Sequence, residues 1–279
     1  MSAMRPFLAP ALAAGLALGP VVARADTAPI LASYTGYIAG LPILELDAEF
    51  QFRPDGRYVV TTRFRTRGIA AAFVSGEQTS RPEGEAPQNP AAALRPLRYS
   101  MEGTWNGKAR RILLDYVGAT PVVRDLVPPN TDEREPVPEA QQAGTVDVLT
   151  AVAGLARAVS RTGRCEGTAA TFDGRRRTDF TAVTAGTEVL APERRGIFSG
   201  PVTTCRFEAR QVGGFFKTWD REEAAKPRHG VAWIARPIAE GPPVPVRMEI
   251  ENGYFGLATL HLTRIERTDG RVGASRTAN

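Results

Sequence analysis

The sequence predicts a mainly β protein in which a large antiparallel sheet forms a sandwich or an incompletely closed barrel. Two hairpins with matching apolar faces, and further strand-like segments as far as Glu266, favour this fold class. Residues 145–160 alone show the three- and four-residue apolar spacing of an amphipathic helix. We therefore expect about nine or ten strands and one main α-helix, in a single β-rich domain over residues 26–267.

The first hairpin lies on either side of Pro54-Asp55-Gly56. Residues 44–52 and 58–66 both alternate apolar and polar side chains, which is typical of half-buried antiparallel strands. A two-residue loop would place arginines on the apolar face, whereas a three-residue loop with Gly56 in a bulge keeps that face apolar. The predicted pairs are Phe52 with Tyr58, Phe50 with Val60, Leu46 with Phe64, Asp47 with Arg63 and Glu45 with Arg65.

The second hairpin turns at Asn106-Gly107, a strong signal for a two-residue turn. This turn brings apolar residues together on one face and opposite charges together on the other. The predicted pairs are Met101 with Ile112, Tyr99 with Leu114, Leu97 with Tyr116, Glu102 with Arg111 and Arg98 with Asp115.

The remaining segments give weaker patterns. Residues 68–74 predict a short buried strand or a helical turn, and Thr145 and Gly163 are the expected start and stop signals of the helix. Residues 81–96 and the Pro-rich residues 121–144 read as loops. Further strands are expected at 175–183, 202–211 and 231–236, followed by a hairpin over 244–266 that turns near Asn252-Gly253 and a flexible tail at 268–279.

The N-terminus predicts export by a cleaved signal peptide. Arg5 precedes an apolar run over residues 7–22, and Ala23-Arg24-Ala25 places small residues where a signal peptidase reads, so cleavage is expected between Ala25 and Asp26. The run of about 16 residues is short for a membrane span, which needs about 20. We expect a periplasmic protein that does not span the membrane after cleavage.

Charge and composition exclude a nucleic-acid binder. The chain has a net charge of +5, and the leader carries Arg5 and Arg24 without an acid, which leaves +3 on the mature chain. This mild excess lacks the dense basic patch that nucleic acid requires. A hydrophobic fraction of 43% and a charged fraction of 23% are those of an ordinary globular protein.

Cys165 and Cys205 are the two cysteines of the chain. In an oxidising compartment they most simply form a disulfide with each other, and the alternative is two buried free thiols. Closing a loop of this length stabilises the fold by about 4 kcal/mol in the chain-entropy estimate. A metal site would need two further ligands, for which the chain offers only His229 and His261 as histidines.

No catalytic, cofactor-binding or metal-binding site is predicted. The chain lacks a nucleophile elbow, a zinc or calcium motif and a phosphate-binding glycine loop. His229 reads as a surface loop residue and His261 as a sheet-facing residue. Residues 175–177 could bind an anion, but on a strand Arg175 and Arg177 face away from Arg176. The charged edge of a hairpin is therefore the preferred interpretation.

Several short motifs follow one another along the chain, at Tyr34–Gly40, Leu94–Tyr99, Asn106-Gly107, Phe172–Arg177, Trp233-Ile234 and Val244–Arg247. Their order resembles a domain-of-unknown-function family of exported proteins from Gram-negative bacteria. The resemblance covers nearly the whole mature chain and implies export and a β-rich fold, without an activity or site residues. A long Pro-rich insertion at residues 124–142 departs from it.

These features predict a non-enzymatic periplasmic protein of the cell envelope. A curved antiparallel sheet can hold a small ligand in its concavity, so the expected partner is a lipid or another apolar or amphipathic molecule. The alternative is an envelope scaffold or assembly factor that acts through protein–protein contacts. A hydrolase ranks third, because no catalytic constellation is visible.

Overall fold

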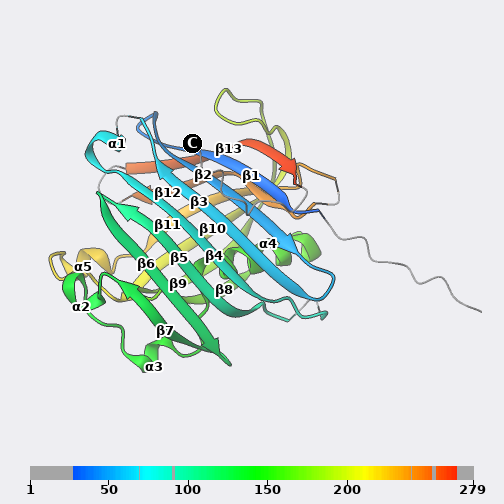
Figure 1. The fold of residues 1–279 in the computed structure, drawn as a ribbon. Coiled ribbons are helices and arrows are strands. Elements are labelled where there is room, and N and C mark those ends of the chain that lie inside the picture. Colours follow the sequence, from blue (N-terminus) through cyan, green and yellow to red (C-terminus); the bar gives the residue numbers. More distant parts are fainter. Residues whose placement is uncertain (1–27, 69, 90–91, 240, 253–255, 269–279) are drawn as a thin grey trace, which may run out of the picture.

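The fold is described by a computed structural model over residues 28–268, without residues 69, 90–91, 240 and 253–255. Within these residues a single antiparallel sheet of thirteen strands runs in the order β7-β6-β5-β4-β3-β2-β1-β13-β12-β11-β10-β9-β8. The sheet curls so that α4 lies behind the strands β3 to β5 (Figure 1).

The strands are β1 (Ile30–Ile38), β2 (Leu41–Phe52), β3 (Arg57–Thr66), β4 (Gly76–Glu85), β5 (Arg95–Trp105), β6 (Lys108–Val117), β7 (Thr120–Val127), β8 (Gly167–Phe172), β9 (Arg177–Leu190), β10 (Gly200–Gly213), β11 (Arg228–Ala235), β12 (Val244–Asn252) and β13 (Gly256–Arg267). The helices are α1 (Ala70–Phe73), α2 (Asn130–Glu133), α3 (Glu139–Gln142), α4 (Val148–Thr162) and α5 (Arg221–Ala224).

The predicted fold class is confirmed as an antiparallel sheet nearly closed into a barrel. The register of the first hairpin is also confirmed, since Phe52 pairs with Tyr58 and Glu45 with Arg65. Gly56 has a φ of +81°, the left-handed conformation that the predicted bulge requires. In the second hairpin, Met101 pairs with Ile112 and the charged pairs lie opposite each other as expected. The predicted pair of Leu97 with Tyr116 is wrong, because the register ends at Arg98 with Asp115 and Leu97 lies at a bulge in β5.

The prediction of a loop over residues 81–96 is wrong for its first part, because β4 continues to Glu85. The inward side chains of β4 are small or polar and show no apolar alternation. Large side chains of neighbouring strands fill the space instead: a Cβ added to Gly84 would lie 2.7 Å from the Tyr58 ring. The periodicity that identifies a strand is absent where neighbouring strands supply the bulk.

The Pro-rich residues 121–144 were predicted as one long loop, and this is also wrong. Residues 120–127 form β7, which pairs with β6, and α2 and α3 follow. Pro121 stands next to Tyr116 at the start of this edge strand, where proline is tolerated. The segment then returns to the body, because the Glu135 amide donates to the carbonyl of Phe215.

The main helix begins later than predicted, at Val148, and Asp147 rather than Thr145 caps it. Val146 cannot join the helix because it forms a parallel bridge with Thr171 of β8. The predicted stop is confirmed, since Gly163 is the C-cap with a φ of 67°. The buried face of α4 consists of Thr150, Ala153, Ala156 and Val159, mostly small side chains that let the helix lie close to the sheet.

The turn at residues 173–176, between β8 and β9, contacts β7 at the opposite edge of the sheet. The Arg175 guanidinium donates to the carbonyls of Val127 and Pro128 at the end of β7, at 2.7 and 3.0 Å. Arg175 is 8% exposed and precedes β9, which begins at Arg177. The predicted returning strand is present as β9, although it begins two residues later than expected. The interpretation of Arg175 as part of a charged hairpin edge is wrong, because Arg175 is buried and contacts the end of β7, the opposite edge strand of the sheet.

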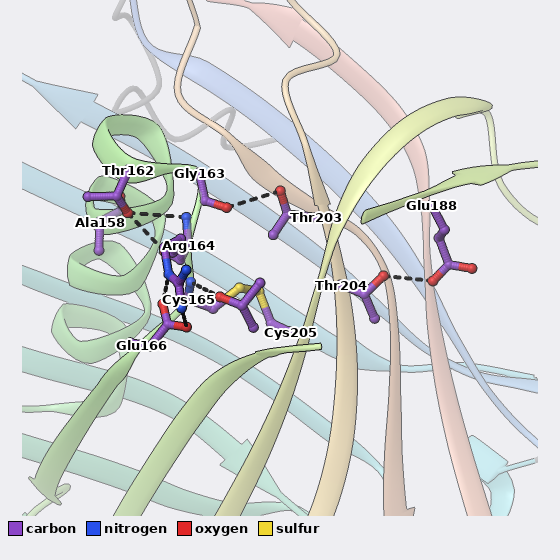
Figure 2. Close-up of a disulfide and its surroundings, with 11 residues drawn as sticks. Ala158, Thr162, Gly163, Arg164, Cys165, Glu166, Glu188, Thr203, Thr204 and Cys205 are labelled. Carbon is purple, nitrogen blue, oxygen red and sulfur yellow. Dashed lines mark hydrogen bonds and ion pairs between the residues drawn. A yellow bond between two sulfur atoms is a disulfide. The ribbon is translucent and has the colours of Figure 1, made fainter. Parts of the chain in front are cut away.

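Cys165 and Cys205 form a disulfide with a Cα–Cα distance of 5.8 Å. Both residues are fully buried, in a cluster with Val159 of α4 and Ile234 of β11. Figure 2 shows the bond between the segment that follows α4 and the strand β10. The disulfide therefore fastens the C-terminal end of α4 to the inner face of the sheet.

Several predicted features lie outside the described residues. They are the leader, its cleavage point between Ala25 and Asp26, the tail beyond Thr268, and Gly253 of the turn between β12 and β13.

Candidate functional site

The inner face of the sheet, which packs on α4, is buried at one end of the barrel and solvent-accessible at the other. On β3, Tyr58 and Val60 are buried, whereas Phe64 on the same face is partly exposed. On β12 the exposure of the inward side chains rises in the same direction, from buried Val246 to Ile250, which is 37% exposed. Alternate residues of a strand share a face, so the interior is filled around α4 and accessible beyond it.

We call this accessible inner surface the open half of the barrel. Its apolar residues come from strands on both sides of α4, and the same change from buried to partly exposed occurs on β2, β5, β10 and β13. The apolar residues that line it are Leu44, Leu46, Phe64, Trp105, Phe207, Met248, Ile250, Ala258 and Leu260.

Two aromatic rings of this inner surface lie over glycines of the neighbouring strands. Trp105 of β5 pairs with Gly76 of β4, and a Cβ on that glycine would lie 2.5 Å from the indole ring. Phe207 lies over Gly230 of the neighbouring strand in the same way. Each ring therefore lies against the glycine of the next strand, at a position where a larger residue would clash with it.

Basic side chains stand on the inner face near the open end. Lys108 and Arg110 share the inward face of β6 with Ile112, and Arg228 shares the inward face of β11 with Ala232. The Arg110 guanidinium forms an ion pair with Glu133, at 2.7 Å. The Arg228 guanidinium lies 3.5 Å from Glu223. The open half is therefore apolar along its walls and has basic side chains at its mouth, of which Arg110 and Arg228 are paired with carboxylates.

A chain of hydrogen bonds fixes the start of α4 at the filled end. The Thr150 hydroxyl donates to Asp147 Oδ2, at 2.6 Å, and the Tyr58 hydroxyl lies 2.7 Å from Thr150 Oγ1. Asp147 is 0% exposed, and burial raises the pKa of its carboxyl to about 6, against the opposing effect of the hydrogen bonds from Thr150. The start of α4 therefore rests on a buried acid whose charge is poorly solvated.

His261 lies on the outer face of β13, beneath the connection between β9 and β10. Its Nδ1 is 2.7 Å from Glu193 Oε1, and its side chain is 3% exposed. The same connection donates the Ile197 amide to the carbonyl of Leu262 and places Arg195 over the Tyr37 ring. We call residues 191–199 the strap, because they cross the outside of β13 and β1.

The His261–Glu193 pair brings a histidine and a carboxylate together, an arrangement that bases in enzymes often have. Here the ring edge of Tyr37 and the strap cover the histidine, so a substrate has little access to it. The pair therefore supports a structural role, holding the strap against the sheet. His229, by contrast, is exposed and lies 3.1 Å from Glu251 on the outer face.

Replacing Glu193 tests this role. In Glu193→Gln the charged partner of His261 is lost, and a hydrogen bond to a charged group contributes about 1.5–3 kcal/mol. We expect exchange of the Ile197 amide, measured by hydrogen exchange, to rise at least fivefold while the sheet amides keep their rates. Arg194→Gln, an exposed position on the same strap, is the control, and equal exchange in the two variants would contradict the assignment.

The structure places the sequence-selected residues in separate regions. The two cysteines are joined inside the barrel, whereas His229 and His261 lie on its outside. No group of three or more metal-ligating side chains occurs in the described part of the chain. The open half was not identified from sequence, although apolar residues on both faces of the hairpin over 244–266 were a signal for it.

Comparison with protein-family models matches residues 31–263 to "Protein of unknown function (DUF3108)". The chain belongs to the DUF3108 family. The predicted resemblance to a domain-of-unknown-function family is therefore confirmed, and the periplasmic location remains a prediction. No curated protein matches this DUF3108 chain.

A solved structure resembles this DUF3108 chain in fold. It is the crystal structure of a beta-barrel-like protein of domain of unknown function DUF1849 from Brucella abortus. The TM-score is 0.56 at 16% sequence identity, over 88% of this chain and 99% of that chain. The similarity supports the barrel-like architecture alone. Among the described residues, no helix combines the length and apolarity needed to cross a membrane.

Proposed function

We propose that this protein binds an apolar or amphipathic molecule, such as a lipid, in the open half of its barrel. The observation that carries the proposal is the change along the inner face from buried side chains at α4 to accessible apolar side chains beyond it. Ligand sites in proteins are concave and mostly apolar, with a few polar groups that fix orientation. In the open half, the walls provide the apolar surface of such a site, and the basic residues at the mouth provide its polar groups.

The cationic mouth favours an amphipathic ligand with an anionic head group. Lys108 and Arg228 stand on the inward face of their strands, near the exposed end of the lining. An apolar chain would contact Phe64, Leu260 and their neighbours, while the head group would meet these basic side chains.

The proposal includes the periplasm as location and binding without catalysis. The leader pattern over residues 1–25 and the Cys165–Cys205 disulfide support export to an oxidising compartment. The covered position of His261 supports a role without proton transfer to a substrate.

A pair of variants on one hairpin tests the binding surface. Ile250 and Leu257 are both exposed apolar residues, but Ile250 faces inward, whereas Leu257, opposite Glu251, faces outward. Because a carboxylate in an apolar site is costly to desolvate, we expect Ile250→Glu to weaken binding of the apolar dye N-phenyl-1-naphthylamine at least tenfold. Leu257→Glu is the matched control and should bind the dye as the unchanged protein does.

Two results would count against this function. Equal dye affinity in both variants would remove the open half as the binding surface. Native mass spectrometry with lipid extraction, on protein purified from the periplasmic fraction, should show a bound lipid; a clean unliganded mass would contradict a carrier role.

A further inference from the structure

The mouth of the open half is surrounded by hairpin connections with exposed apolar side chains. We call the described residues of the connections 39–43, 67–75 and 105–108 the mouth rim. Phe73 is 80% exposed and Leu41 is 54% exposed, and Val74 and Trp105 are also exposed. Exposed apolar side chains gathered on one end of a molecule mark an interaction surface.

Hydrogen bonds join these three connections to one another. The Asn106 amide donates to the carbonyl of Ser75 at 2.7 Å, and the Ser75 amide donates to Asn106 Oδ1 at 3.0 Å. The Arg67 amide donates to the carbonyl of Ile43 at 2.8 Å. The tips are therefore held at fixed positions relative to one another, and the exposed side chains form one surface.

The charge of the mouth rim favours an anionic partner. Its described residues include Arg67 and Lys108 and no Asp or Glu. Arg67 pairs with Glu45 on the neighbouring strand, so its charge is partly compensated. Apolar tips with flanking basic side chains and an interfacial tryptophan are the features of proteins that insert shallowly into a bilayer with anionic lipids.

We propose that the mouth rim docks on the surface of an anionic lipid bilayer, so that the open half faces the lipid. The inference rests on the proposed function, because a ligand of the lipid class has to enter and leave a membrane. Leu41, Phe73 and Trp105 enter the interfacial region of the bilayer, and Arg67 and Lys108 contact the head groups. The inner lining then continues directly into the apolar layer.

Vesicle co-sedimentation tests the docking surface. Vesicles of phosphatidylethanolamine and phosphatidylglycerol are mixed with the purified protein, with Leu41→Ser/Phe73→Ser, or with Val117→Ser/Val189→Ser. Val117 and Val189 are exposed to a similar degree, at 64% and 75%, but lie at the opposite ends of their strands from the mouth rim.

We expect the unchanged protein and the Val117/Val189 variant to bind the vesicles equally, and the Leu41/Phe73 variant to bind at least tenfold more weakly. Binding should also fall as salt is raised, because head-group attraction is screened. Failure of the unchanged protein to bind vesicles, or equal binding by both double variants, would overturn the docking surface and leave a protein partner as its occupant.

Dye binding separates this inference from the proposed function. The Leu41/Phe73 variant should still bind N-phenyl-1-naphthylamine, because neither residue lines the open half. Protein that binds dye but no vesicles refutes the docking surface alone. Protein that binds vesicles through the mouth rim but takes up neither dye nor lipid refutes the proposed function and supports the docking surface.

Discussion

Removing the Cys165–Cys205 disulfide is expected to lower the free energy of unfolding by about 4 kcal/mol, the chain-entropy value for a loop of this length. The two sulfurs join residues 40 positions apart and are fully buried between α4 and β10. The Cys165→Ala/Cys205→Ala variant keeps the site apolar. Its denaturant midpoint should fall, and its m-value should rise because the unlinked unfolded chain exposes more surface.

The two single alanine variants are the control for this prediction. Because either substitution breaks the link, each single variant should lose nearly as much stability as the double variant. Additive losses would show that packing of the side chains, rather than the link, provides the stability. A count of two free thiols in the denatured, unreduced protein would remove the disulfide altogether.

Replacing Asp147 with asparagine is expected to stabilise the protein at neutral pH and to have little effect in acid. Burial raises the pKa of the Asp147 carboxyl in the folded protein to about 6 from an ordinary value of 3.8. The folded state therefore binds this proton more tightly than the unfolded state does. The contribution of Asp147 to stability is complete below pH 4 and is lost as the pH rises through 6.

A shift of about two pKa units corresponds to about 3 kcal/mol. The difference in unfolding free energy between Asp147→Asn and the unchanged protein should rise from near zero at pH 4 toward this value at pH 7, as measured by urea unfolding. Thr150→Val is the control: it removes a hydroxyl that donates to the carboxylate, so it should destabilise the protein more at pH 7 than at pH 4. A difference that does not change with pH would refute the assignment.

Local features of the sequence were sufficient for the two hairpins. In residues 44–66 the apolar alternation, the charge pattern and Gly56 all require one register, and that register is present. The end of the main helix at Gly163 was predicted for the same reason, since a left-handed C-cap depends on one residue. These signals act between residues that are close in the chain.

Contacts between distant segments explain the predictions that failed. The inner face of β4 consists of small or polar residues because Tyr58 and Trp105 of its neighbours occupy the space. Asp147 replaces Thr145 as the cap because β8 holds Val146 in an extended conformation. Arg175 is buried because β7 presents two carbonyl groups to it.

The same difference between local signals and contacts of distant segments applies to the candidate site. The sequence alone determined the β-rich fold class, the register of the hairpins and the pair of cysteines, because each depends on local alternation, turn chemistry or composition. Only the tertiary structure decided which inward-facing residues are covered. Tyr58 is buried against Thr150 of α4, whereas Phe64 stays partly exposed on the same face of the same strand. The alternation of a strand is the same along its length, whereas burial depends on what packs against it.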